Sequence, residues 1–487
     1  MDLDADICFR ALSARDRRFD GRFFVAVRTT GIYCRPICPA RTPRRDRVAF
    51  FACAAEAERE GYRACFRCRP ELAPGLGPVD AVPRLVAAAA ARIEAGFLNE
   101  GSVDDLAAAL GVTSRHLRRT VRAELGASLV ELAQSKRLAI AKQLLHDTRL
   151  PMAEVAFAAG FSSLRRFNAL FGARFGRPPS AVRRDQGGSA AAGPLLLRLE
   201  FRPPFDWDAE LAFLAGRCTA GVEQVEGSTY RRTVRLGGHQ GFVAVSFEAA
   251  RPALRVEVSP SLSGALLPLV ARLRALFDLD AHPDAVAARL RRDPLLARSV
   301  RRHPGLRVPG AFDGFEAAAR VVIGQQVSVA AATTIAGRLA GALGGSIATP
   351  YPGLDRLSAT AEAVAGASED RLAKLGMPGA RARTLIAVAE ACAGGRLALY
   401  RGGDAVAART ALLGLPGVGP WTAELVAMRA LGAPDAFPGG DLGVLRALGV
   451  TSTRAAEARA EAWRPWRAYA VMHLWNRARK GDAHGGA

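Results

Sequence analysis

The chain has 487 residues, of which 50% are hydrophobic, and it carries a formal net charge of +21. This length predicts three or four domains, each with enough apolar residues for a sizeable core. The acidic first residues exclude a secretory signal and no apolar run is long enough for a membrane span, so we expect a soluble cytoplasmic protein without a membrane partner. Both halves are basic, which permits contact with phosphates, although a GC-rich genome produces the same arginine-rich composition.

Four of the eight cysteines form two close pairs in the N-terminal part of the chain. The pairs are Cys34-x3-Cys38 and Cys65-x2-Cys68, with 26 residues between them. Two such pairs separated by a loop are typical of a tetrahedral four-thiolate zinc site, and the alternative is a set of buried thiols. The other four cysteines lack paired spacing and are expected to serve packing.

The segments Phe23–Cys38 and Gly61–Pro70 surround these cysteines. Both resemble the N-terminal domain of the Ada family. The resemblance implies one zinc ion, structural and thiolate-activating, at a site that accepts a methyl group from a DNA methylphosphotriester. It further implies that Cys34 is the methyl acceptor and that the other three cysteines of the two pairs are its co-ligands.

The charge of such a site indicates how it would act as a sensor. Zinc would keep Cys34 as a thiolate at neutral pH, so that a nucleophile is always present. Four thiolates around Zn²⁺ leave two net negative charges, which repel ordinary phosphodiesters but tolerate a neutral phosphotriester. Methyl transfer removes one of these charges and consumes the site. We therefore expect a one-shot sensor whose affinity for DNA rises after the reaction.

Two helix-turn-helix patterns follow, over residues 102–119 and 152–167. In the first pattern Gly111 makes the turn, and Thr113 with Ser114 opens the second helix. Together with the segment Phe171–Pro179, these patterns resemble the AraC-type DNA-binding domain.

This second resemblance implies an all-α domain that binds promoter DNA, with RNA polymerase as the partner of an activator. A helix around residues 129–145 would place two recognition helices in successive major grooves. For any single arginine, a solvated surface cation is equally expected. The candidate contacts to bases or phosphates are Ser114, Arg115, Arg118, Ser162, Arg165 and Arg166.

The C-terminal half changes from strands to helices. Runs at residues 195–201, 229–236 and 241–248 predict strands, and the pattern is helical from about Leu266. Further on, Leu-Pro-Gly-Val-Gly is typical of a helix-hairpin-helix, in which Gly417 and Gly419 let backbone amides approach a phosphate. Hairpins of this kind also occur in purely structural DNA binders.

A loop rich in glycine and proline, Ala436–Gly443, follows the hairpin and contains Asp441. This layout is similar to the helix-hairpin-helix glycosylase superfamily, and segments spread over residues 194–482 resemble AlkA-type 3-methyladenine DNA glycosylases. The resemblance implies that the Asp441 carboxylate is catalytic and stabilises an oxocarbenium-like sugar once the base has been flipped out. The alternative is an aspartate in a surface turn. The resembling segments are 203–207, 277–279, 304–310, 323–330 and 463–470.

Phe213, Trp421 and Trp475 match base-pocket positions of that family, although each would equally serve as a core aromatic. Gln326 occupies the position where some relatives insert an apolar wedge into DNA, so we expect it to contact DNA. Leu425 and Leu442 stand where some relatives have tyrosines, which would change the range of substrates.

Three absences from the sequence shape the expected chemistry. Bifunctional relatives carry a lysine where this chain has Trp421, so we expect a glycosylase without strand cleavage. No cysteine cluster follows Asp441, which excludes an iron–sulfur cluster. No Pro-Cys-His-Arg motif occurs, which excludes the guanine methyltransferase of many Ada proteins.

Together these patterns predict a multidomain, mainly α chain in adaptive response to DNA alkylation. A methylphosphotriester-sensing regulator of transcription would be fused to a monofunctional glycosylase that acts on double-stranded DNA. One alternative is a transcription factor whose glycosylase lobe is an inert DNA clamp, and another is an enzyme whose N-terminal half only localises it. The expected domains are a small α/β zinc-binding methyl-acceptor domain (1–78), an all-α AraC-type domain (79–185), a linker (186–193), an α+β lobe (194–265) and an all-α helix-hairpin-helix glycosylase domain (266–487).

Overall fold

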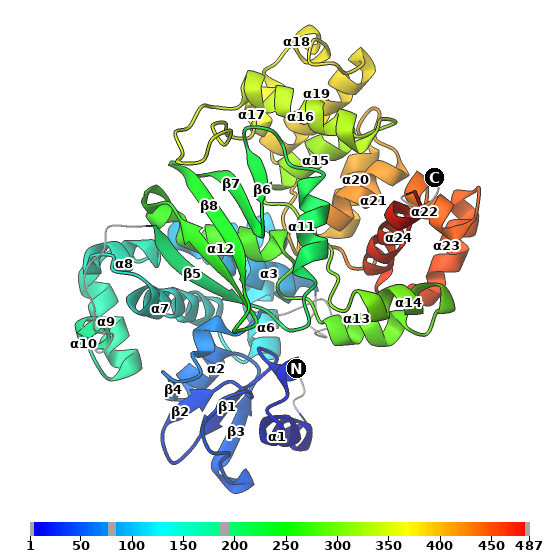
Figure 1. The fold of residues 1–487 in the computed structure, drawn as a ribbon. Coiled ribbons are helices and arrows are strands. Elements are labelled where there is room, and N and C mark those ends of the chain that lie inside the picture. The colour runs from blue at the N-terminus through cyan, green and yellow to red at the C-terminus, as the bar shows by residue number, and fades with distance from the viewer. Residues whose placement is uncertain (1–3, 76–83, 185–193, 483–487) are drawn as a thin grey trace. The chain divides into compact units, whose positions relative to one another are not determined.

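The computed structural model describes residues 4–75, 84–184 and 194–482, and the chain divides into two compact units. The first unit comprises residues 1–203 and 236–271, and the second comprises residues 204–235 and 272–487. Helices dominate both units (Figure 1), which confirms a mainly α, multidomain fold. The predicted linker 186–193 lies outside the described residues, so the expected domain limits remain predictions. None of the helices that the structure describes is long and apolar enough to cross a membrane.

The N-terminal part of the first unit is a small α/β domain, drawn in blue in Figure 1. Its elements are α1 (Ala5–Ser13), η1 (Arg17–Phe19), β1 (Phe24–Val27), β2 (Ile32–Cys34), η2 (Arg45–Arg47), β3 (Val48–Phe51), α2 (Ala54–Arg59) and β4 (Arg63–Ala64). The strand order is β3-β1-β2-β4, with β4 parallel to β2 and the other pairs antiparallel. Leu12, Phe23 and Val48 belong to the core of this domain. The sheet places Cys34 at the end of β2 and Cys65 directly after β4.

Two helix-turn-helix pairs follow in the same unit. The helices are α3 (Arg84–Glu94), α4 (Phe97–Glu100), α5 (Val103–Ala109), α6 (Ser114–Leu125), α7 (Leu129–Asp147), α8 (Met152–Ala158), α9 (Leu164–Phe175) and α10 (Pro179–Arg184). The first pair is α5 with α6, the second is α8 with α9, and α7 joins them. Thr113 and Ser163 cap α6 and α9, because their hydroxyl oxygens accept backbone N–H bonds from His116 and Arg166. Both predicted helix-turn-helix units are therefore present.

Apolar spacing decides which face the second helix of each pair buries. Phe167, Phe171 and Phe175 recur every four residues along α9 and are all buried. Their rings also contact one another in sequence along the helix. The same four-residue spacing in α6 buries Leu117, Val121 and Leu125.

The strands of the C-terminal half include all three that the sequence predicts. In the first unit, β5 (Leu195–Glu200), β8 (His239–Glu248) and β9 (Ala253–Val258) pair antiparallel, with β9 between the other two. A hairpin of β6 (Glu223–Glu226) and β7 (Thr229–Leu236) follows α11 (Trp207–Ala215) in the chain. The sequence patterns predicted β5, β7 and β8 but missed β6, β9 and α11.

The composition of segment 70–78, which is rich in proline and glycine, predicts a linker, but the segment is structured where it begins. Pro70–Leu72 form a short 3-10 helix, η3, and the side chain of Leu72 is buried. The carboxylate of Glu71 accepts a hydrogen bond from Lys142 Nζ over 2.9 Å. The linker prediction is wrong for these three residues, because composition does not reveal burial against a partner far along the chain. Residues 76–78 lie outside the part that the structure describes.

The rest of the second unit is helical, as the sequence predicts. The 3-10 helix η4 (Pro260–Ala265) and α12 (Leu266–Leu276) lead into it. Its further helices are α13 (Pro283–Leu290), α14 (Pro294–Arg302), α15 (Gly314–Ile323), α16 (Val329–Leu343), α17 (Ala361–Ala365), α18 (Glu369–Ala373), α19 (Gly379–Ala393), α20 (Ala405–Leu413), α21 (Pro420–Arg429), α22 (Leu442–Leu448), α23 (Thr453–Ala460), η5 (Glu461–Trp463) and α24 (Arg467–Asp482). Helix α20 packs against α21, and α22 packs against α24, which fixes the loop that carries Asp441.

Candidate functional site

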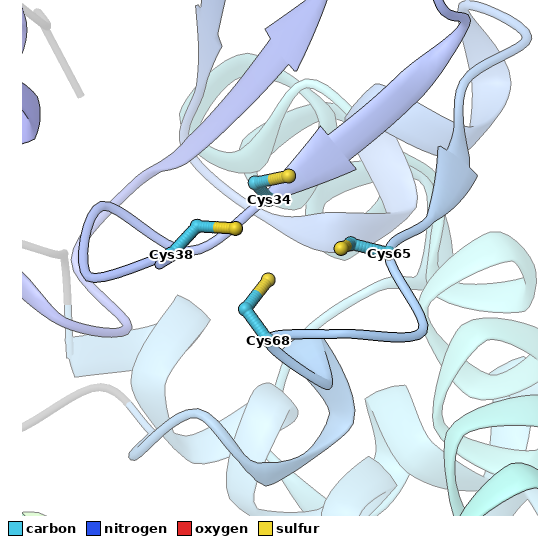
Figure 2. A group of neighbouring side chains, drawn as sticks. All are labelled: Cys34, Cys38, Cys65 and Cys68. Carbon is cyan, nitrogen blue, oxygen red and sulfur yellow. The ribbon is translucent and has the colours of Figure 1, made fainter. Parts of the chain in front are cut away.

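Four cysteine side chains point toward one another at the edge of the N-terminal sheet (Figure 2). Cys34 ends β2, Cys38 lies in the loop that follows, and Cys65 and Cys68 flank the turn after β4. Their sulfur atoms all lie within 4.8 Å of one another. Four sulfurs at such separations fit one tetrahedral zinc ion, because Zn–S bonds are about 2.3 Å long.

Backbone N–H groups support the sulfurs of this cluster. The N–H of Arg35 donates to Cys68 Sγ over 3.4 Å, and the N–H of Arg67 donates to Cys65 Sγ over 3.3 Å. Hydrogen bonds of this kind favour the thiolate over the thiol. The cluster is also partly buried, since Cys38 and Cys68 are buried while Cys34 and Cys65 are half-buried. The donor set therefore fits a zinc–thiolate centre that a reagent can still reach at Cys34.

The buried side chain of Arg35, next to Cys34, ties this centre to its surroundings. Its guanidinium pairs with the carboxylates of Asp20 and Glu200 and donates to the carbonyl oxygen of Cys68 over 3.3 Å. A buried cation needs such partners, because an unpaired charge in the protein interior is costly. The loop between Cys34 and Cys38 is thus held in place.

The predicted DNA contacts of the helix-turn-helix pairs lie at the starts of α6 and α9. Ser162, Arg165 and Arg166 are exposed, and so are Arg115 and Arg118, whereas Ser114 is half-buried. Arg115 and Arg165 each lie two residues before the first buried residue of their helix, Leu117 or Phe167, and therefore face away from it. Their exposure leaves them available to a DNA groove.

In the second unit, Asp441 caps α22 and is held by two tryptophans. Its Oδ1 accepts a hydrogen bond from Trp475 Nε1 over 2.8 Å and another from the backbone N–H of Val444 over 3.1 Å. Its Oδ2 accepts a hydrogen bond from Trp421 Nε1 over 3.3 Å. These donors are neutral, so they orient the carboxylate without cancelling its charge. Three sequence-predicted residues, one carboxylate and two indoles, therefore meet at one place.

Phe213 completes an aromatic wall beside Asp441. Its ring is nearly parallel to that of Trp475, with an interplanar angle of 16° and centroids 6.2 Å apart. Two guanidinium groups also lie against Phe213, with the Cζ of Arg217 3.9 Å and the Cζ of Arg429 4.8 Å from the ring centroid. The wall is thus both aromatic and close to positive charge.

A buried carboxyl group close to this wall, that of Glu210, lacks hydrogen-bond partners among the described residues. Glu210 lies on α11, three residues before Phe213, is only 1% exposed, and neither carboxylate oxygen has a hydrogen-bond partner among the described residues. Burial, together with the nearby carboxylate of Asp278, raises the pKa of Glu210 to about 8. Burial also lowers the pKa of Arg429 to about 10. Glu210 could not be predicted as a site residue, because nothing in a short helical segment marks a buried carboxyl.

The helix-hairpin-helix is closed by contacts that the sequence did not predict. Gln325 Nε2 donates to the carbonyl oxygen of Gly417 over 3.0 Å and to Thr422 Oγ1 over 2.9 Å. Gly417 has a φ of +76°, and a Cβ there would meet Thr384 Oγ1 at 2.0 Å, so only glycine fits. The adjacent Gln326 is exposed and has a φ of +55°, a strained value for a residue other than glycine.

Other residues near Asp441 differ in accessibility. Leu442 is 69% exposed and Leu425 is half-buried, so Leu442 is the more accessible of the two leucines. Gly443 was not singled out from the sequence, yet a Cβ there would lie 3.1 Å from the ring of Trp475. Glycine at this position lets the indole reach Asp441.

Four family models match successive parts of the chain. The metal binding domain of Ada matches residues 7–71, and a helix-turn-helix domain matches residues 106–185. The AlkA N-terminal domain matches residues 196–313, and the HhH-GPD superfamily of base excision DNA repair proteins matches residues 319–468. The order of these matches agrees with the order of domains predicted from the sequence.

Similar proteins and folds agree with these matches. A DNA-3-methyladenine glycosylase 2 of Escherichia coli (strain K12) is 35% identical over 57% of this chain and 95% of its own length. The fold of a 3-methyladenine DNA-glycosylase from Archaeoglobus fulgidus covers 58% of this chain and 98% of that chain, with a TM-score of 0.51 and 24% identity.

One relative spans nearly the whole chain. It is a probable bifunctional transcriptional activator/DNA repair enzyme AlkA of Mycobacterium tuberculosis (strain ATCC 25618 / H37Rv), 42% identical over 97% of this chain and 96% of its own length. The four-cysteine centre, the two helix-turn-helix pairs and the carboxylate behind the hairpin occur here in the same order as the matched domains. The chain therefore belongs to the family of bifunctional transcriptional activator and DNA repair enzymes, in which an Ada-type regulator is fused to an AlkA-type glycosylase.

Proposed function

We propose that the second unit hydrolyses the N-glycosidic bond of alkylated bases, such as 3-methyladenine, in double-stranded DNA. The observation that carries this proposal is the Asp441 carboxylate, held by the indole N–H groups of Trp421 and Trp475 beside the ring of Phe213. A carboxylate fixed by neutral donors keeps its negative charge for the positive charge that develops on the sugar.

The chemistry of the leaving group explains why one carboxylate is enough. An N-alkylated purine carries a positive charge and departs with the electrons of the glycosidic bond, so it needs little acid catalysis. The base must first leave the stack, and the half-buried indole of Trp475, packed against the buried ring of Phe213, offers a π face that attracts an electron-poor base. Trp421 stands where a lyase would need an amine, so we propose release of the base without strand cleavage.

The direct test is the release of free base from methylated duplex DNA, followed by chromatography. We expect release of 3-methyladenine over many turnovers and no cleavage of the strand until alkali is added. Binding of methylated DNA without any release of base would show that the second unit is an inert clamp.

A second function is favoured by the cysteine centre. We propose that Cys34 takes the methyl group of a DNA methylphosphotriester: an S–C bond forms, the C–O bond breaks, and the phosphodiester leaves with the electron pair. One zinc ion per chain, held by the four cysteines, would supply a thiolate at neutral pH. The half-buried position of Cys34, which leaves part of its side chain accessible, and the backbone N–H bonds to Cys65 and Cys68 support this role.

The helix-turn-helix pairs give this reaction a readout. We propose that the methylated protein binds promoter DNA through α6 and α9 and activates transcription with RNA polymerase as its partner. Elemental analysis should find one zinc per chain, and mass spectrometry should find one added methyl group on Cys34. Promoter binding that does not depend on methylation would indicate that the first unit only localises the enzyme.

A further inference from the structure

The strongest feature outside the proposed chemistry is a set of buried contacts that joins the cysteine centre to the second helix-turn-helix. Lys142 lies on α7 and is only 1% exposed. Its Nζ donates to the carbonyl oxygen of Cys65 over 2.9 Å and to Glu71 Oε2 over 2.9 Å. The same ammonium lies 4.6 Å from the ring centroid of Phe66, the residue after Cys65. A helix of the DNA-binding domain thus places a cation on the backbone of a cysteine ligand.

A second contact reaches the other cysteine of the same pair. Arg69, next to Cys68, donates to both carboxylate oxygens of Asp147, the last residue of α7, over 2.9 and 3.1 Å. Arg69 has a φ of +51°, a strained value for arginine, so its backbone is held by its surroundings. Both ends of the segment from Cys65 to Cys68 are therefore attached to α7.

A third contact reaches the proposed methyl acceptor. Tyr33 precedes Cys34 directly, is buried, and donates through its hydroxyl to Glu58 Oε1 over 2.9 Å. The other carboxylate oxygen of Glu58 pairs with the guanidinium of Arg174, near the end of α9. These contacts thus connect Cys34, through Tyr33 and Glu58, to α9, the second helix of the second pair.

Aromatic packing connects the same elements. The ring of Phe66 lies 6.0 Å from that of Phe175, which ends α9, and 6.0 Å from that of His146 on α7. Buried ion pairs and packed rings of this kind do not stretch continuously, because leaving a buried charge unpaired is costly and interiors are close-packed. A small displacement of the cysteine loops is therefore passed on to α7 and α9.

We propose that α7 and α9 are part of the methyl sensor, held by the pairs Lys142–Glu71, Arg69–Asp147 and Arg174–Glu58, so that methylation of Cys34 changes the DNA-binding domain directly. This proposal rests on the methyl transfer proposed above. It goes beyond relief of charge repulsion at the DNA, because it requires a change in the protein when no DNA is bound.

The direction of the change follows from the reaction. Methyl transfer turns the Cys34 thiolate into a neutral thioether, which is a weaker ligand, and removes one negative charge from the centre. The attraction between the centre and the Lys142 ammonium then falls, and the end of β2 is held less firmly. We therefore expect the ends of α7 and α9, where these contacts lie, to open locally more often in the methylated protein, while the start of α9 with the candidate DNA contacts stays formed.

Hydrogen exchange of the full-length, zinc-loaded chain tests this directly. The protein is methylated with a duplex that carries one methylphosphotriester, separated from the DNA at high salt, and compared with protein treated with the unmethylated duplex. We expect amides near the ends of α7 and α9 to exchange about threefold faster or more after methylation. Equal exchange in both samples, with Cys34 fully methylated, overturns the proposal. Absence of any methyl group on Cys34 instead overturns the proposed function, and this inference with it.

Paired variants test which contacts carry the change. Lys142→Met with Glu71→Gln removes both charges of one pair, and Arg174→Met with Glu58→Gln does so for another, which avoids a lone buried charge. The matched control is Lys136→Met, on the exposed side of α7, where Lys136 pairs with Glu94. We expect the methylation effect to fall to less than half in each paired variant and to persist in the control. An undiminished effect in both paired variants overturns the role of these contacts.

Discussion

The two proposed reaction centres of this chain differ in whether the carboxylates near them are paired with cations. Around the cysteine centre, the buried carboxylates of Glu58, Glu71 and Asp147 each contact a cation. Beside the aromatic wall of the second unit, Asp441 contacts only neutral donors, and Glu210 has no hydrogen-bond partner among the described residues. Ion pairs connect the first centre to its neighbours, whereas in the second centre no ion pair with a described residue neutralises the Asp441 carboxylate.

This difference matches the two kinds of reaction. A centre that reacts once must convert a local change into a lasting signal, and ion pairs with α7 of the DNA-binding domain serve that purpose. A centre that turns over must return to its starting state after each cycle, and an oriented but uncancelled carboxylate can stabilise positive charge repeatedly. The contrast teaches that the surroundings of the reactive group, as well as the group itself, separate a sensor from a catalyst.

The largest expected effect is the loss of methyl transfer while base release continues. Cys34→Ser keeps a possible oxygen ligand but loses the soft sulfur nucleophile, so methyl transfer should fall below detection by mass spectrometry. Release of 3-methyladenine should stay within about twofold of the parent, because its catalytic group is elsewhere. Cys392→Ser, at a half-buried cysteine of the second unit, is the control for loss of a thiol. Methyl transfer that survives in the Cys34 variant would refute the assignment of this cysteine.

The next effect breaks the catalyst alone. Asp441→Asn should lower the rate of base release by about 100-fold or more while DNA binding persists, because the carboxylate supplies charge in the transition state. Asparagine still caps a helix, so α22 should remain intact. Asp404→Asn is the matched control, since Asp404 caps α20 in the same unit through two backbone N–H bonds. Base release near the parent rate in the Asp441 variant would remove this residue from the mechanism.

The third effect tests the buried carboxyl group of Glu210, beside the aromatic wall. With a pKa of about 8 when folded and an ordinary value of 4.5, Glu210 keeps a proton in the folded protein that the unfolded chain has lost between these pH values. Stability therefore falls as the pH rises through this window. Glu210→Gln should raise the free energy of unfolding by about 4 kcal/mol at pH 8 and by little near pH 4.5.

Tryptophan fluorescence can follow this change during urea titration, because all five tryptophans lie in the second unit. The difference between variant and parent should grow with pH. A difference that is the same at both ends of the pH range would mean that the Glu210 carboxyl is not held protonated by burial.

The smallest expected effects compare how much each of the two indole N–H donors to Asp441 contributes to kcat. Trp475→Phe keeps an aromatic ring but loses the 2.8 Å hydrogen bond to Asp441, and should lower kcat about tenfold. Trp421→Phe loses the longer bond of 3.3 Å and should lower kcat only about threefold. Steady-state kinetics of base release gives both values. The opposite order would show that Trp421, and not Trp475, is the main support of the carboxylate.

Parts of this arrangement were predictable from the sequence, for local reasons. The cysteine pairs and the loop of Asp441 occur in short characteristic segments, and the helix-turn-helix pairs follow from spacing and capping at Thr113 and Ser163. The structure brings the four cysteines together and places Asp441 between Trp421 and Trp475, as a site would require.

The remainder depends on contacts between distant residues, which a local pattern does not contain. Lys142 lies in a helix where a lysine is ordinarily exposed, and only its contact with Cys65 reveals its place. Gln325 directly precedes Gln326, the predicted wedge, and its sequence position does not reveal the contact with Gly417 that closes the hairpin. Strand β6 was missed because Glu223–Glu226 is too short and polar to show a clear alternation.

The most direct test of the whole account counts reaction events per chain on one substrate. A duplex that carries both a methylphosphotriester and 3-methyladenine is supplied in large molar excess, and the protein and the released base are analysed from the same sample. We expect one methyl group per chain, on Cys34, together with many released bases per chain. Base release that stops at one event per chain, or methyl groups on residues other than Cys34, would contradict it.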